Sequence, residues 1–467
     1  MKQLALNYNL PKAIIAQRSN LGRRSRGRTI PSQSADTHKS VNALLQTQYG
    51  LSEDSYREYG VKHGILSSYL GDKDSFRLCT EGLYTDLQRC DAYNIASIVK
   101  TMPEALYNVL PEGPCGDVGK DVALLPEGQP LGIINRKIAV EIISQLKQYN
   151  ANGSACISSR GILLDGKRGT GKSYILNHLG MWARNNGWMV ILESSPSKYA
   201  KEIGSIKRSN AGSEFAVKFL ETLLLANKEK LSMINVSLPL YGKVSLDGNH
   251  VTYSKRMFNG LIEKAIKEEL EIFMEEGNTD ALECEKERLK LWHSYRQQFK
   301  IPLLTDVLPG PKNLAQIAQF GVENETYANQ AIYEIFNQLK HQTQFPLLII
   351  VDEYNECFPV SEYLSIKYDN TKFNGWIPSY HLAMPRLFSM FDGHQYKRGM
   401  KVMATTWTRT KRRQYKPELL GIMPHEVRTV RNFTPKEYAN HIHHLQQTQT
   451  LFNFPNDKTM YFYMLTG

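Results

Sequence analysis

An eight-residue phosphate-loop pattern, G-x-x-x-x-G-K-[ST], constrains what this chain can fold into more than any other feature. Residues 166–173 read Gly-Lys-Arg-Gly-Thr-Gly-Lys-Ser and match the pattern at every fixed position, with a further glycine at 169. The apolar segment 161–165 before the loop predicts a short buried strand, and apolar residues at helical spacing after it predict a helix. Strand, loop and helix in this order are the context that the motif requires.

The residue types in this loop suit the binding of nucleotide phosphates. Glycines let the backbone turn tightly, so that its N–H groups can point at phosphate oxygens, and the following helix adds the partial positive charge of its N-terminus. Lys172 is expected to reach the β- and γ-phosphates, and the Ser173 hydroxyl to bind Mg²⁺. The predicted nucleotide-binding residues are Gly166, Lys167, Arg168, Gly169, Thr170, Gly171, Lys172 and Ser173.

A second apolar run, residues 347–351, ends directly at Asp352 and Glu353. A buried strand with an aspartate at its tip is the usual partner of a phosphate loop, so Asp352 is expected to hold the Mg²⁺ shell opposite Ser173. The alternative is a buried strand followed by two exposed acids. Glu353 could polarise a water for attack on a phosphate, or it could form a surface salt bridge.

Three further groups of residues leave alternatives open. Thr405 and Thr406 end another apolar segment and could contact a γ-phosphate or its attacking water, or merely end the strand. A basic run could supply a cation to the phosphates or form a solvated face that contacts a phosphate backbone; its arginines are Arg409, Arg412 and Arg413. Three histidines on a predicted helix lack nearby cysteines or carboxylates, so they are interpreted as surface residues: His441, His443 and His444.

Strand and helix patterns alternate along the second part of the chain. Strands are predicted at 161–165, 188–193, 347–351, 401–406 and 427–430, and helices at 133–146, 262–273, 281–298 and 328–339. Thr434-Pro-Lys-Glu437 predicts a capping box with proline at the first helical position. Alternating elements favour a mostly parallel α/β sheet covered by helices on both faces.

The same patterns divide the chain into three parts. Residues 1–40 form a basic leader, 41–130 an irregular N-terminal extension, and 131–467 the nucleotide-binding domain with a helical insertion at about 240–300. The leader has no acidic residue before Asp36, which is typical of a mitochondrial transit peptide but also fits a basic arm on RNA or a disordered arm.

Composition narrows the class of protein. The net charge of 57 − 46 = +11 favours polyanionic partners, although a basic protein without a nucleic-acid role has the same charge. No apolar run is long enough to span a membrane. The six cysteines form no C-x-x-C pair, and their scatter is typical of free thiols in a reducing compartment.

Several segments together resemble the death-associated-protein family, the GTP-binding protein of the mitochondrial small ribosomal subunit. They are GKRGTGKS, LLIIVDEYNECF, KVMATTWTRT, PELLG and VRNFTPKEYANHI, within roughly residues 130–467. The resemblance implies an AAA-like P-loop NTPase fold, bound GTP or GDP with Mg²⁺ on residues 166–173 and Asp352, ribosomal proteins and rRNA as partners, and a mitochondrial matrix location. It implies neither membrane insertion nor a DNA partner.

The resemblance has limits. The family often has glycine where this chain has Glu353, residues 1–130 match poorly, and the insertion is longer than expected. The motifs alone do not choose guanine, because the nearest match to an N-K-x-D strand end, residues 227–230, lacks the aspartate. The leading hypothesis is a structural ribosomal protein that holds a nucleotide with slow or no GTP hydrolysis. The alternatives are an ATP-hydrolysing AAA-type or signalling switch NTPase, and a basic RNA-binding adaptor with a degenerate pocket.

Overall fold

The computed structural model describes residues 83–152, 160–200, 214–242, 263, 266–275, 280–298, 304–366, 373–379, 382–407, 416–452, 454 and 459–466. The chain divides into two compact units, each made of separate stretches of sequence. Of the described residues, those within 198–344 and 359–387 belong to the first unit, and those within 83–197, 345–358 and 388–466 belong to the second. The predicted leader and the candidate arginines Arg409, Arg412 and Arg413 lie outside the described residues.

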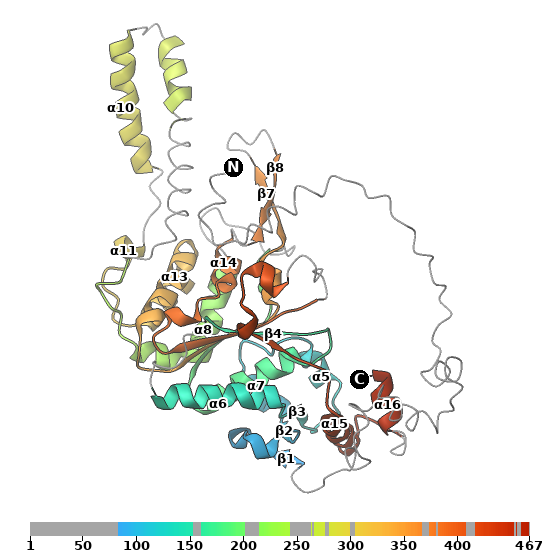
Figure 1. Ribbon diagram of the computed structural model, residues 1–467. Helices are drawn as coiled ribbons and strands as arrows, with labels where there is room; N and C mark the ends of the chain where they lie inside the picture. The colour runs from blue at the N-terminus through green and yellow to red at the C-terminus, as the bar shows by residue number, and fades with distance from the viewer. Residues whose placement is uncertain are drawn as a thin grey trace, which may run out of the picture. The chain divides into compact units, whose positions relative to one another are not determined.

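A five-stranded parallel sheet runs through the second unit (Figure 1). Its strands lie in the order β10 (Val427–Thr429), β4 (Ile162–Asp165), β9 (Gly399–Ala404), β6 (Leu347–Val351) and β5 (Met189–Glu193). The predicted α/β class with a mostly parallel sheet is therefore confirmed. Every residue of the three inner strands and of the edge strand β5 is buried, as expected for a parallel sheet that is covered on both faces.

The register brings the carboxyl ends of these strands to one edge. Asp165 pairs with Thr429, and Val351 pairs with both Glu193 and Met403. The loops that follow β4, β6 and β9 therefore begin side by side. β9 begins two residues before the predicted strand 401–406 and ends at Ala404, which leaves Thr405 and Thr406 just beyond the sheet.

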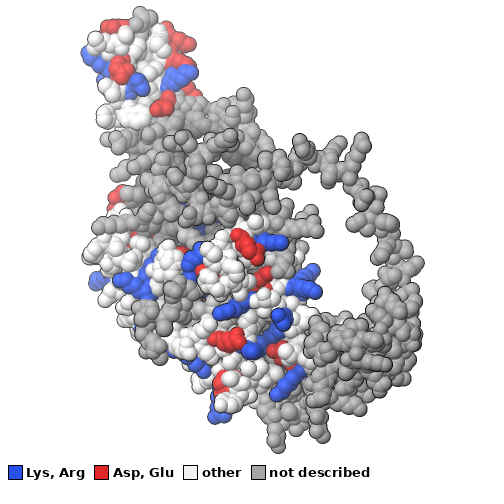
Figure 2. Space-filling view, viewed as in Figure 1, with Lys and Arg blue, Asp and Glu red and all other residues white. Residues whose placement is uncertain are grey.

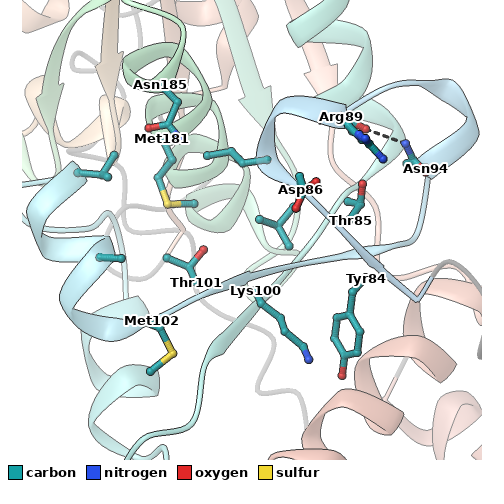
Figure 3. Close-up of a pocket in the computed structure, with 14 residues that line it drawn as sticks. Tyr84, Thr85, Asp86, Arg89, Asn94, Lys100, Thr101, Met102, Met181 and Asn185 are labelled. Carbon is teal, nitrogen blue, oxygen red and sulfur yellow. Dashed lines mark hydrogen bonds between the residues drawn. The ribbon is translucent and has the colours of Figure 1, made fainter.

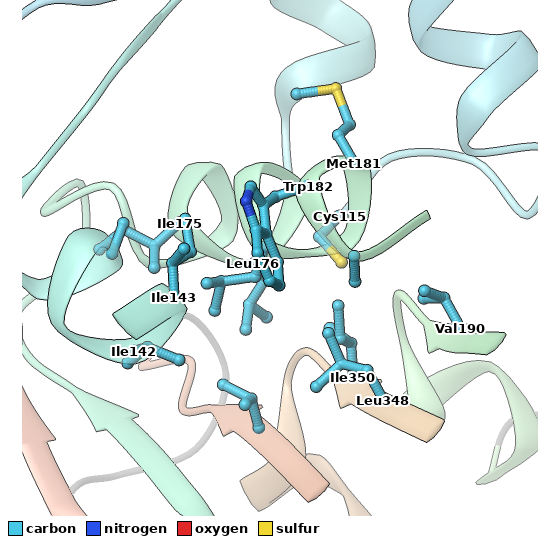
Figure 4. Close-up of a cluster of buried hydrophobic side chains, with 14 of the residues drawn as sticks. Cys115, Ile142, Ile143, Ile175, Leu176, Met181, Trp182, Val190, Leu348 and Ile350 are labelled. Carbon is cyan, nitrogen blue, oxygen red and sulfur yellow. The ribbon is translucent and has the colours of Figure 1, made fainter. Parts of the chain in front are cut away.

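Two helices cover one face of the sheet. α7 (Lys172–Asn185) packs across β5, β6 and β9, and α6 (Lys137–Asn152) packs against α7. Their apolar side chains form the main core with Leu348 and Ile350 of β6 (Figure 4). The core includes Trp182 and Trp188, whose ring centroids are 6.3 Å apart.

The predicted helix at 133–146 is wrong at its start. Residues Leu131–Ile134 form strand β3, which pairs antiparallel with β2 (Ile98–Thr101), and the helix α6 begins only at Lys137. A short apolar run such as Leu-Gly-Ile-Ile fits a buried strand and a helix face equally well, and pairing with β2 decides between them.

The described part of the N-terminal extension is ordered around this core. It forms β1 (Tyr84–Thr85), η2 (Leu87–Arg89), η3 (Ala92–Asn94), β2 (Ile98–Thr101), α4 (Pro103–Val109) and α5 (Val118–Ala123). β1 and β2 complete a three-stranded sheet with β3. Leu106, Leu110, Cys115 and Val118 belong to the same hydrophobic cluster as α6 and α7, so the extension contributes to the core.

The rest of the second unit follows β6 and β9. It comprises η6 (Tyr354–Cys357), η8 (Gly393–Gln395), η9 (Pro417–Leu420), η10 (Pro424–Glu426), α15 (Pro435–Gln447) and α16 (Thr459–Thr466). The predicted capping box at the start of α15 is confirmed. The Thr434 side chain accepts from the Glu437 amide, the Glu437 carboxylate accepts from the Thr434 amide at 2.8 Å, and Pro435 is the first helical residue.

The first unit is mainly helical. It contains α8 (Glu214–Met233), α10 (Ala281–Gln298), α11 (Leu304–Val307), α12 (Leu314–Glu323), α13 (Glu325–His341), β7 (Val360–Ile366) and β8 (Phe373–Pro378), while η5 (Pro196–Ala200) and α14 (Ala383–Ser389) cross the unit boundaries in sequence. α10 has the predicted bounds, and residues 266–275 are also helical. Figure 2 shows charged side chains of both signs in this part of the molecule. One ion pair of these helices joins Lys267 to Glu271 at 3.7 Å. This mixture is typical of a solvated helical insertion.

Among the helices of the described residues, none has both the length and the apolar character needed to cross a membrane.

Candidate functional site

The loop between β4 and α7 has a backbone that demands glycine at three positions. Gly169 (φ 82°) and Gly171 (φ 84°) adopt left-handed conformations, which residues with a Cβ rarely take. Gly166 is needed for a different reason, since a Cβ there would overlap the carbonyl oxygen of Val430. The spacing of the three glycines in the motif therefore has a local cause at each position.

The motif lysine lies within this loop. Lys172 is 7% exposed, and its ammonium donates hydrogen bonds to the carbonyl oxygens of Gly166 (3.0 Å) and Lys167 (2.8 Å). Lys167, Arg168 and Gly169 form the exposed rim of the loop, whereas Thr170 is buried. The positive charge of Lys172 is thus held under the loop backbone.

The structure brings Ser173 and Asp352 into direct contact, although they lie 179 positions apart in the sequence. The Ser173 hydroxyl donates to Oδ2 of Asp352 at 2.6 Å, and the backbone amide of Glu353 donates to Oδ1 at 2.8 Å. Asp352 is 2% exposed, and burial raises the pKa of its carboxyl to about 6, against the lowering effect of the Ser173 hydrogen bond. Two oxygen side chains therefore meet beside the glycine loop.

Glu353 has an unusual backbone and a constrained side chain. Its φ of 50° and ψ of 34° lie in the left-handed region, which costs a residue with a Cβ roughly 1–2 kcal/mol. Its carboxylate accepts hydrogen bonds from the hydroxyls of Ser195 and Ser197, the second at 3.3 Å. Glu353 is thus tied to the segment after β5, and among the described residues no cation forms the surface salt bridge considered from the sequence.

The two threonines after β9 are held by protein groups. Thr405 is 1% exposed and donates to Oδ1 of Asp165 at 2.7 Å, as Trp407 Nε1 does at 3.0 Å. The Thr406 amide donates to Oδ1 of Asn355 at 2.7 Å, and Asn355 Nδ2 donates back to the Thr406 carbonyl at 2.6 Å. These bonds link the end of β4 to the segment after β9, and that segment to η6, which follows β6.

Arg136 is a positioning residue that no motif in the sequence indicates. It is 7% exposed, and its guanidinium donates to the carbonyl oxygens of Thr170 (2.6 Å), Arg431 (2.7 Å) and Asn432 (3.0 Å). Its Nε lies 3.6 Å from a carboxylate oxygen of Glu437. Arg136 therefore ties the glycine loop to the segment that leads into α15.

The interpretation of the three histidines as surface residues is wrong for His444. His444 is 1% exposed, and it lies against Gly132 of β3, where a Cβ would overlap its ring. Burial lowers the pKa values of His444 and His441 to about 4. Helical spacing alone could not reveal the burial of His444, because His444 is covered by β3, and most of β3 was not predicted as a strand.

Residues 227–230, the nearest match to a guanine-specific strand end, lie inside helix α8. A helix cannot supply such a strand end. This near match therefore does not recognise a guanine base.

A separate hollow of about 610 Å³ lies at the opposite end of α7 from Ser173. Figure 3 shows Met181 and Asn185 of α7 on one side, and residues of β1, β2 and the start of α4 on the other, including Lys100 and Met102. None of the motif residues lines it. This hollow is therefore distinct from the candidate nucleotide site.

The residues at the glycine loop fit a magnesium-bound nucleotide by their chemistry. Ser173 and Asp352 offer the hard oxygen ligands that Mg²⁺ prefers, and Mg²⁺ takes only one or two such groups from the protein. No group of three or more His, Cys, Asp or Glu in the described residues is arranged to hold a metal, so phosphate oxygens and water would complete the shell. The lysine under the loop supplies the matching positive charge.

Comparison with known proteins gives one family. The family model for the mitochondrial ribosomal death-associated protein 3 matches residues 133–458. The match begins in β3 and includes the glycine loop, Asp352 and α15. No curated protein matches the chain.

Proposed function

The chain belongs to the mitochondrial ribosomal death-associated protein 3 family, and we propose that within this role it holds a guanine nucleotide with Mg²⁺. Membership makes the chain a component of the mitochondrial small ribosomal subunit, located in the matrix, with ribosomal proteins and rRNA as its partners. In the proposed role the nucleotide is a ligand that stabilises the fold, because anything that binds only the folded state shifts the folding equilibrium toward it.

The single observation that carries the proposal is the contact of Ser173 with Asp352 at 2.6 Å, next to a loop with two left-handed glycines. Serine and aspartate from distant segments meet where the two halves of a phosphate-loop site are expected to meet.

Each group of the site has a separate task in this proposal. The loop amides and the N-terminus of α7 would attract phosphate oxygens, because the N–H groups of a helix's first turn carry a partial positive charge. Lys172 would exchange its two carbonyl acceptors for phosphate oxygens. Ser173 and Asp352 would hold Mg²⁺, which neutralises phosphate charge. Arg136 keeps the loop in place from behind.

The restraint on Glu353 favours a structural ligand over rapid hydrolysis. A general base must present an oxygen that can accept the proton of its water, and both serine hydroxyls donate to one of the two, Oε2 of Glu353, so that only Oε1 is left for this task. The preference for guanine rests on the family resemblance, since no described residue is assigned to the base.

Mass identification of the nucleotide that copurifies with the protein tests the proposal. Retained GDP or GTP with Mg²⁺, no multiple turnover, and sedimentation with the mitochondrial small ribosomal subunit are the expected results. A Glu353→Gln variant separates the two roles, because its nucleotide content is expected to equal that of the parent. Multiple-turnover hydrolysis of ATP that this substitution abolishes would replace the proposal with the switch-enzyme alternative.

A further inference from the structure

One face of helix α7 is committed to holding the N-terminal extension. Ser173, Asn177, Gly180 and Arg184 follow one another at spacings of four, three and four residues, so their side chains share a stripe along the helix. This stripe begins at the residue that is expected to bind Mg²⁺. A segment that packs along this stripe is therefore held at a fixed position relative to Ser173 and to the proposed metal site.

The far end of the stripe anchors the segment that follows α4. The Arg184 guanidinium donates to the carbonyl oxygen of Val109 and forms an ion pair with Glu112. At Gly180, an added Cβ would lie only 3.4 Å from Leu110, which shows how closely the extension approaches the helix. The extension is thus attached to α7 at residues 109–112, a few positions N-terminal to the part that lies next to the candidate site.

Asn177 then holds the next turn of the extension by its backbone. Its Oδ1 accepts from the Cys115 amide at 2.8 Å, and its Nδ2 donates to the Cys115 carbonyl at 3.2 Å. Both residues are fully buried. A carboxamide that satisfies the donor and the acceptor of one buried residue fixes the position of that residue, because either group left unpaired would cost about 1–3 kcal/mol.

The following residue, Gly116, lies directly against the two proposed Mg²⁺ ligands. Its φ of 65° is left-handed, and a Cβ added to it would lie 2.5 Å from Oγ and 2.6 Å from Cβ of Ser173. The same added Cβ would be 3.8 Å from Oδ2 of Asp352. Only a glycine allows the extension to approach Ser173 and Asp352 this closely.

We propose that the Cys115–Gly116 turn is part of the magnesium–nucleotide site and that Asn177 is the positioning residue that holds it there. The inference rests on the proposed function and adds to it a segment that lies N-terminal to the matched family region. Because the turn packs against both metal-side oxygens, binding of Mg²⁺–nucleotide and docking of residues 109–121 are thermodynamically coupled, and each strengthens the other.

A matched pair of alanine variants of the full chain tests this coupling. Gly116→Ala introduces a left-handed alanine that overlaps Ser173, whereas Gly113→Ala introduces one at φ 88° with nothing within 4 Å. The affinity for a fluorescent N-methylanthraniloyl GTP is measured with Mg²⁺ and with EDTA. We expect Gly116→Ala to reduce the gain in affinity from Mg²⁺ by about 10- to 100-fold, the range found when groups behind metal ligands are changed.

Gly113→Ala is expected to keep the full magnesium gain, because it has the same backbone strain without the overlap. A second measurement on the unsubstituted chain, hydrogen exchange, is expected to show slower exchange of the Cys115 amide with Mg²⁺ and the probe than with the probe in EDTA. Equal magnesium gains in both variants, or an unchanged Cys115 amide, would overturn the inference while leaving nucleotide binding intact. An unsubstituted chain that does not bind the probe overturns the proposed function as well.

Discussion

Replacing Arg136 by methionine tests whether the glycine loop depends on a buried guanidinium behind it. Methionine keeps much of the length and the apolar contacts of the arginine but has no donor. The substitution leaves the carbonyl oxygens of Thr170, Arg431 and Asn432 without this partner, and it removes the cation 3.6 Å from Glu437, whose side chain is 4% exposed.

The size of the effect follows from these contacts. A hydrogen bond from a charged group contributes about 1.5–3 kcal/mol, and breaking a buried ion pair by removing one partner costs about 3–5 kcal/mol. Because the contacts share one side chain, their energies do not add. We expect Arg136→Met to lower the free energy of unfolding of the second unit by about 3–5 kcal/mol.

The neighbouring residue offers a control. Lys137 forms an ion pair with Glu141 at 3.9 Å, with side chains 75% and 54% exposed, so Lys137→Met is expected to cost less than about 0.5 kcal/mol. Urea unfolding is followed by tryptophan fluorescence, since Trp182 and Trp188 lie in the core of the second unit. An Arg136→Met variant within about 1 kcal/mol of the Lys137→Met control would refute the reasoning.

Three further predictions concern the loop and the core. Lys172→Ala is expected to weaken nucleotide binding by about 2–3 kcal/mol and to lower the melting temperature of the nucleotide-bound protein. Lys167→Ala, at the exposed rim of the loop, serves as the control and is expected to have a smaller effect. Unchanged nucleotide occupancy in Lys172→Ala would contradict the assignment. Gly166→Ala is expected to destabilise the second unit by about 1–3 kcal/mol or more, because its Cβ overlaps the backbone of Val430; a neutral result in thermal unfolding would exclude this close approach. Burial lowers the pKa of His178 to about 4, below its ordinary value near 6.5, so its contribution to stability is complete above pH 6.5 and is lost as the pH falls toward 4. At pH 5 this loss is about 2 kcal/mol. Between pH 7.5 and pH 5, the free energy of unfolding of His178→Gln is therefore expected to fall by about 2 kcal/mol less than that of the parent. Identical losses of the two proteins in urea unfolding would show that His178 is not buried in its neutral form.

Local patterns predicted those parts of the fold whose causes are local. The capping box at Thr434–Glu437 and the bounds of α10 depend on residues three or four positions apart, and the structure has both as expected. The central strands were recognised because continuous apolar runs are typical of strands buried on both faces. The start of α6 was not predicted correctly, because Ile133 and Ile134 form a strand only through pairing with β2.

The candidate site divides in the same way. The loop 166–173 and Asp352 were found because their motifs are written in consecutive residues, although their binding role stays a prediction. Arg136, Asn177 and Gly116 carried no signal, because each acts on a partner that is far away in sequence. Arg136 reaches Asn432 across 296 positions, and Asn177 reaches Cys115 across 62.

The sequence by itself determined which segments can be strands, helices and a phosphate-binding turn, since glycine spacing and apolar period act within a few residues. Only the tertiary structure decided that Ser173 meets Asp352 and that the N-terminal extension lies against both. The physical reason is that parallel strands end at one edge of the sheet, and that a stripe on α7 binds the backbone of the extension. Neither the sheet order nor the helix face that becomes buried is set by neighbours along the chain.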